Sequence, residues 1–202
     1  VMTESIPPVI TIILPDGIVP TNSVNLSVTS NEAVKNCVYK LDSAANVSFG
    51  SGTSTLHSTI FNANDGAHSI NVTCFDTSNN LGSAVKSFSV DTTIPAISNT
   101  SLDVGITNST SVFDTQVNAN STIMIGTVSG VYTRTINSTS FVNVHSINID
   151  ALISATNYFY QIKVCAQNTL CTTSAEQTFT TLNADGTDST APVISGVNSG
   201  NI

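Results

Sequence analysis

Four cysteines are the residues whose chemistry is easiest to read in this sequence, and they allow three disulfide pairings. Cys37 and Cys74 fall at inward positions of two expected strands that would be adjacent or opposed in a sandwich, so we expect them to be bonded. Cys165 and Cys171 flank a short hairpin loop, and Cys165 falls on the outward face, so a bond there would lie at the surface. Zinc sites favour closer cysteine spacing with histidine partners. Both pairs therefore indicate disulfides and an oxidising compartment.

Seven Asn-x-Ser/Thr triplets are the second chemical signal, because this triplet is the acceptor of N-linked glycans. Asn25 and Asn71 alternate with inward apolar residues, so their side chains should face solvent. We therefore expect N-linked glycans on a secreted protein. The seven acceptor residues are Asn25, Asn46, Asn71, Asn99, Asn108, Asn120 and Asn137.

The three histidines are not spaced for catalysis or for metal binding. His57 and His68 could meet across neighbouring strands, but the further ligands of a metal site are missing around them and around His145. The sequence has no nucleophile elbow, no phosphate loop and no dinucleotide fingerprint. We therefore expect no catalytic residues, no metal site and no enzyme activity.

Calcium at the joints between domains is the one cofactor that the sequence leaves open. Residues 76–80 and Asp91 could supply oxygen ligands at one joint, and residues 185–188 at another. The spacing does not match an EF-hand loop, and capping of turns by Asp and Asn is the alternative explanation. We therefore expect no cofactor beyond calcium at these joints.

The composition excludes some partners. The net charge is −8, and nucleic-acid binding needs a basic face, so nucleic acid is not an expected partner. Charged residues make up 9% of the 202 residues, against about 25% in ordinary globular proteins. Ser, Thr and Asn replace them and give an uncharged polar surface, which favours glycans or contacts between copies. No run approaches the ~18 apolar residues of a membrane span.

A repeated motif around a proline divides the chain. Pro95 and Pro192 lie in the similar stretches DTTIPAIS and DSTAPVIS, and Pro8 lies in a shorter version of the motif. Spacing of roughly 90 residues is typical of tandem domains. We predict a first domain over residues 1–92, a second over 93–184, and a linker with the start of a further repeat or a donor strand over 185–202.

Strand patterns of period two dominate both domains, and no helical period is evident. Each domain shows about seven short strands separated by turns, which predicts a β-sandwich. In the second domain, a Leu at position 152, six residues before Tyr158, indicates a tyrosine corner, in which the hydroxyl bonds to upstream backbone. The fold class is therefore all-β, with two tandem sandwiches joined by a short proline-containing linker.

These patterns carry a resemblance to known families. The first domain resembles the immunoglobulin-like repeats of archaeal cell-surface proteins in residues 8–10 (PVI), 36–39 (NCVY), 65–68 (DGAH), 71–76 (NVTCFD) and 91–95 (DTTIP). That resemblance implies a disulfide between strands. The second domain resembles fibronectin type III domains in residues 152–164, and residues 126–132 (GTVSGVY) resemble a hairpin of the amino-terminal modules of purple acid phosphatases. The usual tryptophan is missing, and Phe113 is expected in its place.

We expect an extracellular structural protein at the cell surface, as a subunit or repeat of a filament, sheath, surface layer or adhesin stalk. Its partners would be copies of itself or further repeats of the same chain. The alternating Val193, Ser195 and Val197 could form a donor strand that completes a neighbour's sheet; alternatively, they begin a third repeat. The alternative function is a non-catalytic spacer or binding module of a secreted hydrolase.

Overall fold

The structure is a computed structural model that describes residues 6–185. The described residues are all-β and form two compact units. The first unit comprises residues up to Thr93 together with Asn168–Leu170, and the second comprises Ile94–Gln167 and the residues from Cys171 on. The predicted β-sandwich fold class is confirmed. The donor-strand residues Val193, Ser195 and Val197 lie outside the described residues, as does the last part of the predicted linker.

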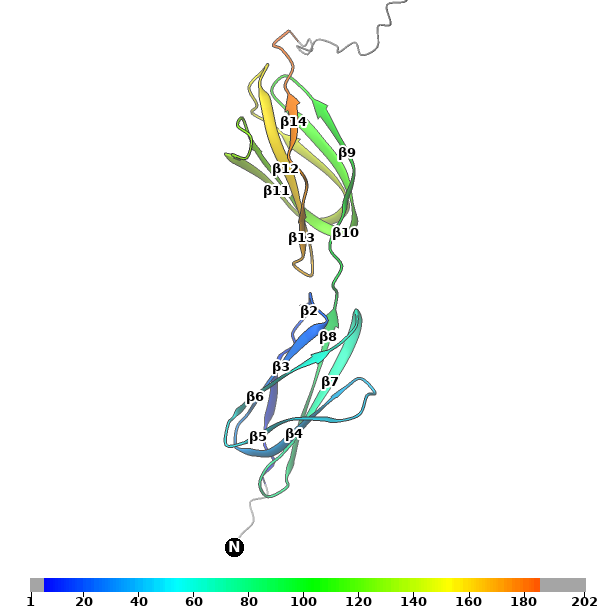
Figure 1. Cartoon of the computed structure of the whole chain (residues 1–202), viewed down its shortest axis with the longest axis vertical. Coiled ribbons are helices and arrows are strands. Elements are labelled where there is room, and N and C mark those ends of the chain that lie inside the picture. Colours follow the sequence, from blue (N-terminus) through cyan, green and yellow to red (C-terminus); the bar gives the residue numbers. More distant parts are fainter. Residues whose placement is uncertain (1–5, 186–202) are drawn as a thin grey trace, which may run out of the picture. The chain divides into compact units, whose positions relative to one another are not determined.

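The first unit packs a three-stranded sheet against a five-stranded sheet (Figure 1). Their orders are β1-β3-β6 and β2-β8-β7-β4-β5, and every pairing is antiparallel except the parallel pair of β2 with β8. The strands are β1 (Ile10–Leu14), β2 (Ile18–Val19), β3 (Ser23–Ser30), β4 (Val34–Leu41), β5 (Val47–Gly52), β6 (Leu56–Asn62), β7 (Gly66–Phe75) and β8 (Leu81–Val90).

Alternation along the strands builds the core of the first unit. Val24, Leu26 and Val28 of β3 are fully buried, whereas Asn25 between them is exposed. The strand β7 does the same, with Ile70 and Val72 inside. Burying a side chain of this size contributes roughly 1.5–3 kcal/mol, so a shift of register by one residue, which would reverse every side chain, is strongly disfavoured.

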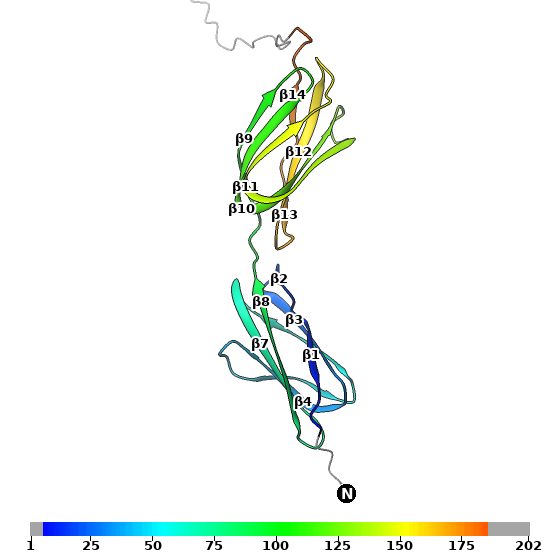
Figure 2. The ribbon, with the colours of Figure 1, turned by 180° about the vertical axis from the view of Figure 1, so that it is seen from behind.

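The second unit is built around one long hairpin of β10 (Ser109–Gly126) and β11 (Arg134–Ile149). The register of this pair shifts between Asp114 and Ala119 and again before Ser121, so each strand bends there. The first half of β10 also pairs with β9, and the second half also pairs with β12 (Figure 2). The remaining strands are β9 (Ile97–Val104), β12 (Asn157–Ala166), β13 (Cys171–Thr173) and β14 (Gln177–Thr180).

Alternation along β12 builds much of the core of the second unit. Tyr158, Tyr160, Ile162 and Val164 of β12 all point inward and are buried. Phe113 is fully buried, at the centre of the core, where the resemblance to fibronectin type III domains placed it in the role of the missing tryptophan. Its ring stacks on His145 with centroids 4.6 Å apart.

Candidate functional site

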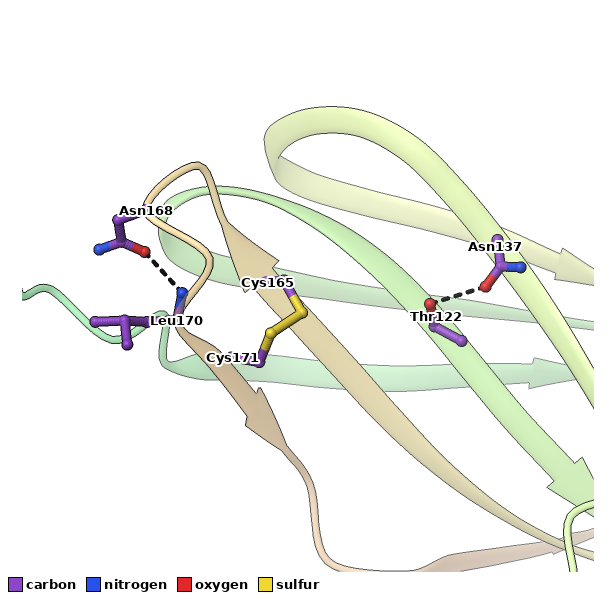
Figure 3. Close-up of a disulfide and its surroundings, with 6 residues drawn as sticks. All are labelled: Thr122, Asn137, Cys165, Asn168, Leu170 and Cys171. Carbon is purple, nitrogen blue, oxygen red and sulfur yellow. Dashed lines mark hydrogen bonds between the residues drawn. A yellow bond between two sulfur atoms is a disulfide. The ribbon is translucent and has the colours of Figure 1, made fainter. Parts of the chain in front are cut away.

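Both disulfides join residues that face each other directly across two neighbouring strands. Cys37 of β4 and Cys74 of β7 are opposite partners in one sheet, and both are fully buried. The sequence left open whether these strands were adjacent or opposed, and they are adjacent. Cys165 and Cys171 close the hairpin between β12 and β13 at the surface (Figure 3). Within that hairpin, the amide of Leu170 donates to Asn168 Oδ1 at 3.0 Å.

The acceptor asparagines of the seven triplets are distributed over both units. Six of them are exposed, and Asn120 is half-buried. The alternation that placed Asn25 and Asn71 outside is therefore reproduced in the structure. An exposed amide is accessible for N-linked glycosylation, but glycosylation itself stays a prediction.

Two of these asparagines make hydrogen bonds that bear on glycosylation. Asn99 Nδ2, the atom that would carry a glycan, donates to Asp114 Oδ2 at 2.8 Å. Asn137 instead accepts from Thr122 Oγ1 through its Oδ1 at 2.9 Å, so its nitrogen points away from that contact (Figure 3). The geometry therefore favours Asn137 over Asn99 as an acceptor.

Two arrangements among the described residues resemble part of a catalytic triad, namely His68 with Asp42 and His145 with Thr115. The geometry of the first opposes that role. His68 Nδ1 bonds to Asp42 Oδ2 and His68 Nε2 to the carbonyl of Asn64, both at 2.8 Å. Both partners accept, so the two contacts favour the doubly protonated imidazolium, in which both ring nitrogens donate. The Asp42 bond, with the Asn64 carbonyl, raises the pKa of His68 although burial opposes this. An imidazolium cannot take a proton from a serine.

His145 is buried in the other unit and lies against Thr115. Its Nε2 is 3.2 Å from Thr115 Oγ1, and its Nδ1 is buried without a partner. Burial lowers the pKa of His145, although the backbone of Val142 and the charge of Asp114 act in the opposite direction. Burial therefore favours the neutral form of this core ring.

His57 does not meet His68. The two lie on β6 and β7, which belong to different sheets. His57 is buried beneath β5, where a Cβ on Gly50 would come within 2.9 Å of the imidazole, so glycine is required at that position. Residues 6–185 contain no group of three or more His, Cys, Asp or Glu side chains that could hold a metal ion.

The aspartates proposed as calcium ligands are engaged in turns. Asp76 Oδ1 accepts from the amides of Ser78 and Asn80, both at 2.8 Å, and Asp76 Oδ2 accepts from Asn80 Nδ2 at 2.7 Å. Burial opposes the charge, but the hydrogen bonds outweigh it and lower the pKa of Asp76. Asp91 Oδ1 likewise accepts from the amide of Thr93. These contacts are turn capping, which was the alternative explanation to calcium binding for these residues. Asp188, at the other joint, lies outside the described residues.

The tyrosine corner is present where the sequence predicted it. The hydroxyl of Tyr158 accepts from the amide of Ile153 at 2.9 Å, and Leu152 is buried beside it. This bond ties the segment before β12 to the core of the second unit.

Sequence reasoning missed a carboxylate that fixes the hairpin of residues 126–132. Glu176 accepts from Ser129 Oγ at 2.6 Å, from the amide of Gly130 at 2.8 Å and from Tyr132 Oη at 2.6 Å. These bonds lower the pKa of Glu176 and raise the pKa of Tyr132 to about 12. More than forty residues separate Glu176 from the hairpin, so no local pattern marks it.

Comparison with solved structures identifies the fold. The fibronectin(III)-like modules of Clostridium thermocellum CbhA match with a TM-score of 0.55 and 11% identity, over 87% of this chain and 95% of that one. Domains A168–A170 of titin match with a TM-score of 0.55 and 11% identity, over 87% of this chain and 67% of that one. Domains FN1–FN3 of chicken CNTN1 match with a TM-score of 0.51 and 12% identity, over 89% of this chain and 70% of that one. No protein-family model and no curated protein matches the sequence.

The class of protein follows from the fold, the disulfides and these likenesses. The described residues form sandwiches with the fibronectin type III-like and immunoglobulin-like fold. Disulfide-bonded modules of this fold are typical of extracellular proteins. No helix in residues 6–185 is long and apolar enough to cross a membrane.

Proposed function

We propose that this chain is an extracellular structural protein of the cell surface, of the kind found in archaeal surface proteins. It acts as a subunit or repeat of a filament, sheath, surface layer or adhesin stalk, and its partners are further copies or repeats. Its function lies in the geometry of linked sandwiches rather than in chemistry at a site.

The combination of disulfides with outward acceptor asparagines carries this proposal. Each unit contains one disulfide, which fits an oxidising compartment. Asn25 and Asn71 stand on the solvent faces of two strands whose inner faces build the core. Glycans there would hydrate a surface on which only 9% of residues are charged.

The arrangement of polar side chains also supports a non-catalytic role. Both ring nitrogens of His68 contact acceptors, His145 is a buried ring stacked on Phe113, and His57 is buried on β6. A hydrolase would need a base beside a nucleophile in a site that substrate can reach, whereas His145 and the Thr115 hydroxyl beside it are both buried. The alternative, a spacer or binding module of a secreted hydrolase, needs a catalytic domain elsewhere in a longer chain.

Peptide mapping of protein from its native source tests the extracellular assignment. We expect glycans on Asn25 and Asn71 and both disulfides intact in unreduced digests.

In an expression host that glycosylates, Ser27→Ala removes the acceptor triplet of Asn25 and should remove one glycan mass. Thr29→Ala, on the same strand and outside any triplet, is the matched control and should leave the mass of the glycans unchanged. Free thiols and unmodified asparagines throughout would contradict the proposal.

A further inference from the structure

The second unit has an open apolar groove along one edge of its sandwich. The groove has a volume of about 490 Å³ and is lined by residues of β9, β12, β13 and β14. Tyr160 and Ile162 of β12 line it, together with Thr172. The rest of the lining is Ile94, Pro95, Ala96, Ile97, Thr100, Ser174 and Gln177, so no charged side chain borders it.

The backbones on both sides of this groove have an unpaired edge. Within residues 6–185, β9 pairs only with β10, while β13 and β14 pair only with β12. An unpaired strand edge accepts a further strand, because its N–H and C=O groups have no partner in the sheet.

The first unit shows how this edge is closed when a strand is present. There the short strand β2 leaves the sheet of β1 and runs parallel to the last strand, β8, with Ile18 opposite Ser89 and Val19 opposite Val90. Backbone bonds extend this pairing, since the amide of Asp91 donates to the carbonyl of Val19 at 3.0 Å. In the second unit, the segment before β9 instead lines the groove, and β14 receives no such strand.

We propose that this groove binds residues 191–197 of a second copy of the chain as an added strand along β13 and β14. The segment reads APVISGV, with β-branched residues at three of seven positions and no charge. Seven extended residues span about 23 Å, which is close to the length of the eight-residue β9. The absence of charge on the segment and on the groove lining avoids repulsion in a chain of net charge −8. This inference rests on the proposed function and specifies the contact that would join copies.

The probe is a fluorescently labelled synthetic peptide of residues 188–202, added to a variant that ends at Asp185 and so keeps every described residue. We expect saturable binding by anisotropy, tighter than for a scrambled peptide, and slower amide hydrogen exchange over residues 171–177. Thr172→Glu would place a carboxylate in the apolar groove and should weaken binding by about tenfold or more, because burying an unpaired charge is costly.

Thr173→Glu is the matched control, because it adds the same charge to the outward face of the same strand, opposite Lys163. It should change the affinity less than about twofold. Equal binding of the scrambled peptide, equal effects of the two substitutions, or protection confined to another part of residues 6–185 would each overturn the inference. If Thr172→Glu fails to fold, the protection of residues 171–177 from amide hydrogen exchange in the unsubstituted protein tests the inference.

The full-length chain separates this inference from the proposed function. Peptide binding together with a full-length chain that stays monomeric at all concentrations would show that the chain's own segment fills the groove, which would overturn the second copy as occupant. Association of the full-length chain without peptide binding would reject the groove and leave the proposed function standing.

Discussion

At the scale of single residues, hydrogen bonds of buried and half-buried side chains fix the conformation of the connecting segments. Tyr158 holds the segment before β12 through Ile153, and Glu176 holds the hairpin that contains Gly130. Gly126 at the base of that hairpin is required, because a Cβ there would lie 2.0 Å from the carbonyl oxygen of Val131.

Tyr158→Phe tests the tyrosine corner. The substitution removes the acceptor of the Ile153 amide and should cost about 1–3 kcal/mol in the free energy of unfolding of the second unit. Tyr160→Phe is the matched control, because Tyr160 lies on the same strand with the same 7% exposure and its hydroxyl is outside the corner. Chemical denaturation of both variants measures the difference. Equal losses would mean that the bond to Ile153 contributes nothing specific.

The two histidines with shifted pKa values should give the units opposite dependences on pH. The folded pKa of His68 is raised above 6.5 by Asp42 and the Asn64 carbonyl, so its contribution to stability is complete below 6.5 and is lost as pH rises through the folded value. The folded pKa of His145 is lowered by burial, so its contribution is complete above 6.5 and is lost as pH falls through the unfolded value.

Calorimetry between pH 5 and pH 8 measures this behaviour. His145→Phe keeps an aromatic ring against Phe113 and should abolish the loss of stability on the acid side. His68→Asn should abolish the loss on the alkaline side while leaving the acid side unchanged. If His145→Phe removed the alkaline loss of stability, or His68→Asn removed the acid loss, the directions of the two pKa shifts would be contradicted.

At the scale of strands and hairpins, each disulfide stabilises one pair of neighbouring strands. Cys37 and Cys74 are 37 residues apart in sequence, whereas Cys165 and Cys171 are six apart. A longer closed loop removes more entropy from the unfolded chain. The two bonds therefore differ in what their removal should cost.

Replacing each pair by alanine tests this difference. We expect Cys37→Ala/Cys74→Ala to lower the free energy of unfolding of the first unit by about 4 kcal/mol, and Cys165→Ala/Cys171→Ala to lower that of the second by about 2 kcal/mol. The buried position of the first pair adds a cavity to its cost. Calorimetry of the two double variants gives the order, and the reverse order would contradict the loop-length argument.

The strands also show how far the sequence predicts the fold. Alternation located the inward faces of β3 and β7, because burial on one side of a sheet imposes a period of two. The sequence indicates about seven short strands in the second domain, whereas β10 and β11 are each one long strand. A shift of register bends them without ending their pairing, and alternation alone does not distinguish such a bend from a turn. The two-residue β2 and the three-residue β13 are too short to show a period.

The candidate sites divide in the same way. The exposure of Asn25 and Asn71 follows from local alternation, and so does the tyrosine corner, because Leu152 and Tyr158 are close in sequence. The Glu176 contacts and the groove beside β13 depend on segments brought together only by the fold. Local patterns in the sequence contain no signal for such long-range contacts.

At the scale of the whole molecule, the two sandwich units present a polar surface with few charges. With only 13 acidic and 5 basic residues among 202, the density of charge is low, so electrostatic repulsion between copies is weak. Such a surface tolerates close approach of identical copies better than a highly charged one. The account therefore predicts association of the native chain through specific strand contacts.

The mass of native, unreduced protein by light scattering, with electron micrographs of the same sample, tests this central claim most directly. We expect assemblies of many copies, visible as filaments, sheets or threads, whose measured mass is a multiple of the 21.0 kDa chain with its glycans. A single species at the mass of one glycosylated chain, unchanged with concentration and featureless in micrographs, would contradict it.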